Sequence, residues 1–414
     1  MARLKPDDVF TPAAPVRDDM FATRRHENLQ DRVDAVLRGE AGRQVVLFGE
    51  TGVGKTSLMG FLCRKRQIPY VRVECGGTFE ETMREALGKI VGEEEIERID
   101  KQSGEAEFGA TVWGFVTGKA RVGKETQRRT VPIPRNITAL AAETLSLLDY
   151  RVLFLDNFEN LAGKPHEQAT TRAIAELLKS FSDRAIEEGF RAKIVVAGIP
   201  SVSEELIALD PATARRTAQI EVGRMPPEEL DQILERGGQK LGLEFEGFAR
   251  SQIVQFSDGF PYYTHLFALH GARRALDRGS DTIGIDDFEQ ALDVILADCD
   301  LALRKAYTDA VETSGDVRVR KSVMEAMANV NDIEVSFKTI RAEFLKLHPD
   351  RYDTMARLNF ISPYLTQLKQ KQILADRGLP KSKNNLYRFA NPLMRGYVRL
   401  VMEREKQQAL QLTA

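Results

Sequence analysis

Short apolar runs alternate with longer amphipathic segments over roughly the first half of the chain. In the amphipathic segments apolar residues recur every three or four positions, as in the series Met83, Leu87 and Ile90, and this spacing predicts helices. The apolar runs have the composition of buried strands and occupy residues 45–48, 70–75, 151–156, 192–198 and 218–222. Strands that alternate with helices predict an α/β domain with a parallel sheet and helices on both faces.

The pattern becomes helical after Pro226 and changes again beyond residue 315. There the expected order is helix, helix, helix, strand, polar turn and strand, which is the order of a winged helix; the segments are 319–328, 337–347, 362–371, 372–374, 376–385 and 386–389. The predicted divisions are an N-terminal segment with a lead-in helix, the α/β core, a helical domain and a winged-helix domain, at 1–40, 41–223, 224–306 and 307–414.

Residues 92–135 interrupt the core pattern. An acidic run is followed by a basic segment with several glycines, whose alternation predicts a β-hairpin or a mobile insertion. Two interpretations remain open for this insertion. It is either a solvated loop or a surface that contacts DNA or another subunit.

The segment after the first apolar run fits the pattern G-x-x-x-x-G-K-[ST] of a phosphate-binding loop (P-loop). Glycines let backbone N–H groups curl around phosphates, and the helix that follows adds a favourable dipole at its N-terminus. Lys55 is expected to reach the β- and γ-phosphates, and the Thr56 hydroxyl to ligate Mg²⁺. The sequence therefore predicts a site for ATP or ADP with Mg²⁺ formed by Gly49, Glu50, Thr51, Gly52, Val53, Gly54, Lys55, Thr56 and Ser57.

The third apolar run ends in Asp156, which is expected to hold Mg²⁺ through water beside Thr56. Hydrolysis also needs a residue that activates or orients water. Glu159 is the candidate base, and the alternative is that Asn157 orients the water while Glu159 is structural.

Arg215 and Arg216 directly precede the fifth apolar run. An arginine at this place can project toward the γ-phosphate bound by a neighbouring subunit and stabilise the charge of the transition state. The alternative is a solvated or salt-bridged pair.

Charge is unevenly distributed, although the whole chain has a net charge of only −2. Residues 301–414 contain 20 Lys and Arg against 12 Asp and Glu, so this part carries +8 and the rest −10. An acidic body with a basic tail is a plausible layout for binding nucleic acid. The candidate DNA contacts are Lys369, Lys371, Lys381, Lys383 and Arg388, although winged helices also mediate protein contacts.

The remaining composition is that of a soluble globular protein, with 43% hydrophobic and 29% charged residues. Apolar runs of the length of a transmembrane helix are absent, and the N-terminal residues lack the apolar core of a signal peptide. The three cysteines show no metal-ligand spacing. We therefore expect a cytoplasmic location with buried, reduced thiols.

Residues 20–300 resemble the AAA+ superfamily, and most closely its origin-recognition-like members and the related signal-transduction ATPases (STAND). The resemblance rests on GETGVGKTS, RVLFLDNFENL, KIVVAGIPS, TARRTAQIEV and SDGFPYYTH. It implies that Arg24 and Arg25 lie near the adenine and that Pro261 belongs to a nucleotide-contacting motif of a helical lid. It also implies an ATPase that assembles into oligomers and acts on or near DNA, where it recruits or loads a partner.

Two departures from the family pattern predict a slow switch. The fourth apolar run offers Val196, Ala197 and Gly198 where a polar sensor is usual, and the nearest hydroxyl is that of Ser201. Tyr262 or Tyr263 stands where the lid often carries an arginine. The alternative functions are a STAND-like signalling ATPase whose winged helix binds and releases a protein partner, and a protein that binds nucleotide without efficient hydrolysis.

Overall fold

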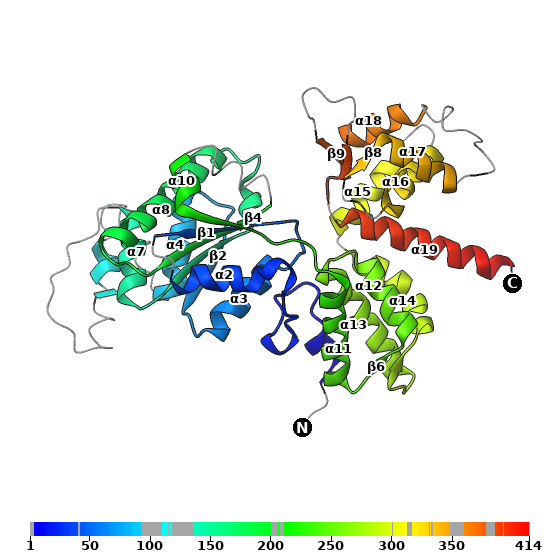
Figure 1. Ribbon diagram of the computed structural model, residues 1–414, viewed down its shortest axis with the longest axis horizontal. Coiled ribbons are helices and arrows are strands. Elements are labelled where there is room, and N and C mark those ends of the chain that lie inside the picture. The colour runs from blue at the N-terminus through cyan, green and yellow to red at the C-terminus, as the bar shows by residue number, and fades with distance from the viewer. Residues whose placement is uncertain are drawn as a thin grey trace. The chain divides into compact units, whose positions relative to one another are not determined.

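The computed structural model describes two compact units, residues 15–223 and residues 1–14 together with 224–414 (Figure 1). The residues described are 4–39, 42–92, 110–114, 116, 117, 136–199, 206, 211–299, 301–312, 317–330, 332, 334–347, 349, 360–377, 386–391 and 393–413. We call the two units the N-terminal unit and the C-terminal unit.

A five-stranded parallel sheet forms the centre of the N-terminal unit, in the order β2-β3-β4-β1-β5. Its strands are β1 (Gln44–Phe48), β2 (Tyr70–Glu74), β3 (Val152–Asp156), β4 (Lys193–Gly198) and β5 (Thr217–Glu221). The helices are α2 (Leu29–Arg38), α3 (Lys55–Lys65), α4 (Phe79–Val91), α7 (Ile137–Leu147), α8 (Glu167–Glu187) and α10 (Pro211–Arg216). The predicted α/β class and parallel sheet are confirmed.

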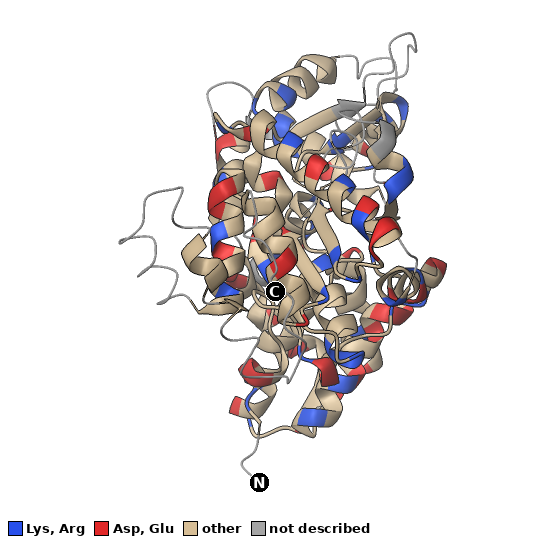
Figure 2. Cartoon of the chain, turned by 90° about the vertical axis from the view of Figure 1, so that its left-hand side faces the viewer, with Lys and Arg blue, Asp and Glu red and all other residues tan. Residues whose placement is uncertain are grey.

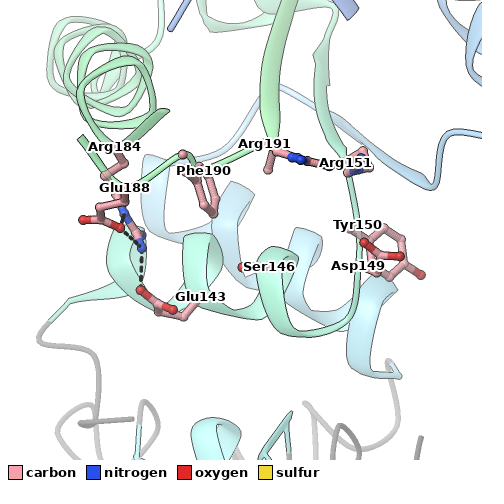
Figure 3. A pocket seen from close by; sticks show the side chains of 11 residues that line it. Glu143, Ser146, Asp149, Tyr150, Arg151, Arg184, Glu188, Phe190 and Arg191 are labelled. Carbon is pink, nitrogen blue, oxygen red and sulfur yellow. Dashed lines mark hydrogen bonds and ion pairs between the residues drawn. The ribbon is translucent and has the colours of Figure 1, made fainter. Parts of the chain in front are cut away.

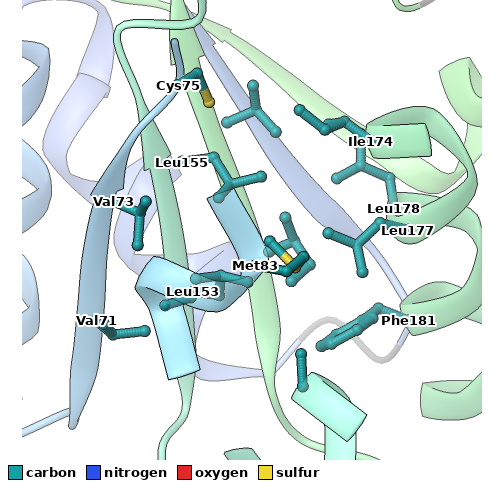
Figure 4. Close-up of a cluster of buried hydrophobic side chains, with 14 of the residues drawn as sticks. Val71, Val73, Cys75, Met83, Leu153, Leu155, Ile174, Leu177, Leu178 and Phe181 are labelled. Carbon is teal, nitrogen blue, oxygen red and sulfur yellow. The ribbon is translucent and has the colours of Figure 1, made fainter. Parts of the chain in front are cut away.

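One face of this sheet packs against α4, α7 and α8. Figure 4 shows Val73 and Leu155 on neighbouring strands pointing toward Met83 of α4 and toward Leu178 and Phe181 of α8. All of these side chains are buried, because alternate residues of each strand share a face and the run at that face is apolar. Packing on both faces leaves the carboxyl ends of the strands as the place for polar function.

Part of the insertion is a helix, so the predicted β-hairpin is wrong for that part. Residues 110–114, 116 and 117 are helical, and Val112, Trp113 and Val116 are buried against Leu87 of α4 and Leu140 of α7. Val112 and Val116 stand four positions apart and so share a helix face. The insertion's basic residues Lys119, Arg121, Lys124, Arg128, Arg129 and Arg135 lie outside the described residues.

The lid helices belong to the C-terminal unit. They are α11 (Pro227–Leu241), α12 (Gly247–Ser257), α13 (Pro261–Asp277) and α14 (Ile285–Asp298), with a short parallel pair of strands, β6 (Glu244–Phe245) and β7 (Thr282–Ile283). The N-terminal helix α1 (Pro6–Val9) packs on α11 and α13. Phe10 fixes this segment, because its ring lies where a side chain at Gly237 would be. The predicted segment 1–40 is thus divided between the two units.

The last part of the chain has the helix and strand order predicted for a winged helix. Its elements are α15 (Leu301–Val311), α16 (Val317–Asn329), β8 (Val335–Ser336), α17 (Phe337–Leu347), α18 (Ser362–Gln370), β9 (Leu374–Arg377), β10 (Leu386–Phe389) and α19 (Met394–Thr413). The three strands form an antiparallel sheet in the order β8-β10-β9. Helix α19 packs on α16 and also on the lid helices α12 and α14.

Two expectations from composition can be checked on the described residues. None of the helices found there is both long and apolar enough to span a membrane. Cys63, Cys75 and Cys299 are free thiols and all three are buried.

Candidate nucleotide-binding site

The P-loop lies between the carboxyl end of β1 and the N-terminus of α3. Gly52 and Gly54 adopt φ angles of 87° and 95°, which L side chains rarely adopt. Gly49 is required for a different reason, because a Cβ there would lie 2.2 Å from the carbonyl oxygen of Val222. The turn therefore needs its glycines, and it leads directly into the N-terminus of α3, where the motif predicts that phosphate binds.

Lys55 is the first residue of α3 and is buried beneath this loop. Its Nζ donates hydrogen bonds to the carbonyl oxygens of Gly49, at 2.9 Å, and Glu50, at 3.1 Å. Burial lowers the pKa of Lys55, and the nearby carboxylates of Glu159, Asp156 and Glu50 oppose that shift. The P-loop cation is thus surrounded by acceptors that keep its charge.

Asp156, at the end of β3, is fully buried and is the centre of a hydrogen-bond network. Its Oδ2 accepts from Thr56 Oγ1 at 2.7 Å, and its Oδ1 accepts from the backbone N–H of Asn157 at 3.0 Å. The sequence predicts that Thr56 and Asp156 share one metal site, and in the structure their side chains are in contact. A hydroxyl and a carboxylate side by side are the hard oxygen donors that Mg²⁺ prefers, so these residues fit the ion.

Arg72 also binds Asp156, although no sequence motif marks it as part of the site. Its Nε donates to Asp156 Oδ2 at 2.8 Å, and its Nη2 donates to Glu74 Oε1 at 3.0 Å. The available signal was a strand in which Arg72 and Glu74 alternate with buried Val71 and Val73. Only the pairing of β2 with β3 shows that these polar residues reach Asp156.

Glu159 and Asn157 follow Asp156 in a tight turn. Asn157 has a left-handed conformation, with φ of 53°, which asparagine adopts more readily than most residues. Glu159 then falls in the 3₁₀ helix η3 (Phe158–Leu161). Its Oε2 is buried without a hydrogen-bond partner among the described residues, and Glu159 is the carboxylate with the strongest effect on Lys55. This places Glu159 beside the P-loop, while its role as base stays a prediction.

The two arginines expected near the adenine differ in their surroundings. Arg24 is buried, and its guanidinium donates to the carbonyl oxygens of Val53, at 2.9 Å, and Gly223, at 2.7 Å. It therefore ties the P-loop to the segment after β5. Arg25 is exposed. Pro261 begins α13 in the C-terminal unit, and nucleotide contact by these three residues stays a prediction.

Arg215 and Arg216 end α10, immediately before β5. Arg216 pairs with Asp183 of α8 at 2.6 Å, whereas Arg215 is exposed. Thr217 pairs with Gln44, the first residue of β1, so both arginines lie at the edge of the sheet opposite to their own P-loop. Five strand residues separate the two edges by roughly 16 Å.

The two departures from the family pattern remain in the structure. Val196, Ala197 and Gly198 of β4 are buried, and Ser201 lies outside the described residues. Tyr263 is buried as well, and its hydroxyl donates to the carbonyl oxygen of Leu393 at 2.7 Å. Tyr263 therefore links the lid to the start of α19.

A hollow of about 470 Å³ opens at the amino ends of the strands, on the side of the sheet away from the P-loop (Figure 3). It lies around the residues that precede β3 and β4. Arg184 lines it and is neutralised by Glu143 and Glu188 of the same wall. Since charges of both signs line the hollow, we assign it no ligand.

The candidate DNA-binding residues are only partly described. Lys381 and Lys383 lie outside the described residues, and Arg388 is exposed on β10. Lys371, just after α18, donates to the carbonyl oxygen of Asp309 at 3.0 Å. Lys369 is half-buried, because Leu365 and Leu368 turn one face of α18 into the core. DNA contact by these residues stays a prediction.

Similar solved structures include Cdc6p from Pyrobaculum aerophilum, with 15% identity and a TM-score of 0.46, covering 96% of this chain and 98% of that one. A Walker-type ATPase of Pyrococcus abyssi has 14% identity and a TM-score of 0.49, with 96% and 98% covered. No curated protein matches the chain in sequence. The family model described as Novel STAND NTPase 1 matches residues 15–262, more than half of the chain, and the chain therefore belongs to that family.

Proposed function

We propose that the protein is an ATP-dependent switch that binds ATP with Mg²⁺ and hydrolyses it slowly. The observation that carries this proposal is the 2.7 Å contact between Thr56 Oγ1 and Asp156 Oδ2 beneath a glycine-dependent loop. That contact joins the end of β3 to the start of α3, as a phosphate and metal site requires. The family supports the nucleotide-hydrolase class.

Each residue of the site has a distinct role in this proposal. Lys55 and the N–H groups at the start of α3 bind the phosphates. Thr56 and Asp156 hold Mg²⁺, which supplies charge that stabilises the leaving phosphate when it is bound. Glu159 accepts a proton from the attacking water, and its buried Oε2 is an acceptor available for that water.

Hydrolysis is proposed to depend on assembly into homo-oligomers. Arg215 is exposed at the sheet edge opposite to its own P-loop, so it can act only at the site of another subunit. Because β4 and the start of α13 lack the usual polar sensor and arginine, turnover is expected to be slow and to serve as a timer.

DNA is the proposed target of the switch, with a protein partner recruited or loaded there. The support is the charge of +8 on residues 301–414 and the winged-helix order of that part. Figure 2 shows basic and acidic residues interleaved along the described helices. DNA binding would therefore depend on individual basic side chains such as that of Arg388, which is exposed.

A signalling function is the second candidate, and two observations favour it. The chain belongs to a STAND family. In addition, α19 is bound to the lid through Tyr263 and through Asp258, which pairs with Arg399 at 3.3 Å. In that function, ATP would control the release of a protein partner bound by the winged helix.

A titration with ATP tests the central proposal. Lys55→Ala should abolish binding because the phosphates lose their main side-chain cation, whereas Lys65→Ala, at the exposed end of the same helix, should bind normally. Equal affinity of the two variants would refute the proposal.

DNA binding at several salt concentrations, with and without ATP, decides between the two targets. Lys369, Lys371, Lys381 and Lys383 changed together to Glu should weaken binding and reduce the salt slope by about one unit for each phosphate that the variant no longer neutralises. If the unsubstituted chain binds DNA at no salt concentration, the signalling function becomes the better candidate.

A further inference from the structure

Arg72 binds the carboxylate that the proposed function assigns to Mg²⁺. Its Nε donates to Oδ2 of Asp156 at 2.8 Å, and the same oxygen accepts from Thr56 Oγ1 at 2.7 Å. The other oxygen, Oδ1, accepts from the backbone N–H of Asn157. Both oxygens of Asp156 are therefore engaged by groups of the protein.

The register of the sheet makes this contact. Arg72 stands opposite Phe154, and Glu74 stands opposite Asp156, in the parallel pairing of β2 with β3. Residues two apart on a strand share a face, so Arg72, Glu74 and Asp156 all project to the same side of the sheet. The guanidinium lies between two carboxylates and donates to each.

The two carboxylates that bind Arg72 differ in exposure. Asp156 is fully buried, and a buried carboxylate without a compensating cation is strongly unfavourable. The side chain of Glu74 is 57% exposed and keeps its hydration. Arg72 is therefore the counter-charge bonded directly to Asp156, with the charge of Lys55 nearby. If another cation displaces Arg72 from Asp156, Glu74 can still hold the guanidinium.

We propose that Arg72 is a positioning residue that competes with Mg²⁺ for Asp156 and so sets the Mg²⁺ concentration at which the site binds Mg²⁺ with ATP. Oδ2 of Asp156 has a limited number of acceptor positions, and Thr56 already uses one. A water on Mg²⁺ that donates to this oxygen must displace the Arg72 Nε. This inference rests on the proposed nucleotide function and adds to that function a minimum Mg²⁺ concentration for binding Mg²⁺ with ATP.

The proposal predicts opposite effects for two charge-removing substitutions. Arg72→Gln removes the competing cation. The Mg²⁺ concentration that gives half of the Mg²⁺-dependent increase in ATP-analogue binding should therefore fall, on the order of tenfold for one charged hydrogen bond. Glu74→Gln removes the other carboxylate that binds Arg72, so the guanidinium should remain on Asp156 and the concentration should rise, by about twofold to threefold. Arg72→Lys keeps a cation and should stay close to the unsubstituted chain.

The experiment is a fluorescence titration of an ATP analogue across a Mg²⁺ series that begins in EDTA, with a thermal melt of every variant. Arg84→Gln is the matched control, because it removes an arginine that pairs with Glu80 on the nearby helix α4. A merely structural Arg72 would lower the melting temperature and weaken binding equally with and without Mg²⁺. The proposed role instead shifts the Mg²⁺ midpoint while binding in EDTA stays within about twofold.

An unchanged or higher Mg²⁺ midpoint for Arg72→Gln would overturn the proposal. If Arg72→Gln does not fold, a Glu74→Gln midpoint at or below that of the unsubstituted chain would overturn it instead. Failure of the unsubstituted chain to bind the ATP analogue at any Mg²⁺ concentration would refute the nucleotide function itself, and this inference with it.

Discussion

Arg224 donates a hydrogen bond from Nη1 to Oδ2 of Asp258 at 2.6 Å, and the same carboxylate faces two arginines of α19. Arg399 lies 3.3 Å from its Oδ1 and Arg395 lies 3.7 Å from it. Burial lowers the pKa of Arg399, and Asp258 opposes that shift. One acidic residue thus holds three guanidinium groups together between the lid and the last helix.

Asp258→Asn is expected to destabilise the C-terminal unit by about 2–3 kcal/mol, because three buried or half-buried cations lose their common anion. Asn tolerates the left-handed conformation that Asp258 has, so the backbone is preserved. Urea unfolding measures the change. The control is Asp231→Asn, which breaks a more exposed pair with Arg250 and should cost less than about 1 kcal/mol. Equal losses would show that the three-arginine cluster adds nothing.

The stability of the C-terminal unit should depend on pH through His265. Burial lowers the pKa of His265 from 6.5 to about 4, and its Nδ1 accepts the N–H of Thr11 at 3.2 Å. Between these two pH values the unfolded chain binds a proton that the folded chain does not. The contribution of His265 to stability is therefore fully present above about pH 6.5 and is lost as the pH falls toward 4, by up to about 1.4 kcal/mol per pH unit.

Urea unfolding at pH 7, 6 and 5 tests this dependence. His265→Asn keeps an acceptor for Thr11 and cannot titrate in this range, so its curve should be flatter. Some pH dependence of stability should remain in His265→Asn because of His270. Burial lowers the pKa of His270 too, although Asp298 opposes that shift. An unchanged slope in His265→Asn would contradict the prediction.

The sheet and the P-loop were predictable because their signals are local. Each strand is a short apolar run, and the loop is one contiguous motif whose glycines the backbone requires, at Gly49 for clearance and at Gly52 and Gly54 for conformation. Asp156 was predictable too, since burying a carboxylate at the end of an apolar strand is unfavourable and therefore indicates a functional role.

Contacts between distant segments were not predictable from the sequence. Arg72 reaches Asp156 only because of the register of β2 with β3. Arg216 at the end of α10 pairs with Asp183 of α8, which lies more than 30 residues earlier in the sequence. The sequence predicts a hairpin where part of the insertion is helical, because short apolar stretches that contain glycine are compatible with either a helix or a strand. Its burial against Leu87 and Leu140 decides for the helix.

Glu159→Gln is expected to leave ATP binding intact and to slow hydrolysis by roughly 10²-fold or more, because the attacking water loses its base. The matched control is Glu167→Gln, whose carboxylate accepts the N–H of Gly163 and should affect turnover little. Single-turnover hydrolysis with saturating ATP measures both. If Glu159→Gln turns over normally while Asn157→Ala does not, the orienting role belongs to Asn157.

Arg215 and Arg216 should differ sharply when they are changed to Ala. Arg215 is exposed and cannot reach its own P-loop, so Arg215→Ala should remove the rise of specific activity with protein concentration that an arginine acting between subunits produces. Arg216 is paired with Asp183, so Arg216→Ala should retain that rise and lose less than about 1 kcal/mol of stability. Mixing Arg215→Ala with Glu159→Gln should restore some activity, because the intact arginine of a Glu159→Gln subunit can face the site of an Arg215→Ala subunit, whose base is intact. Action between subunits would be contradicted if specific activity does not depend on protein concentration and sedimentation shows that the active species is a monomer.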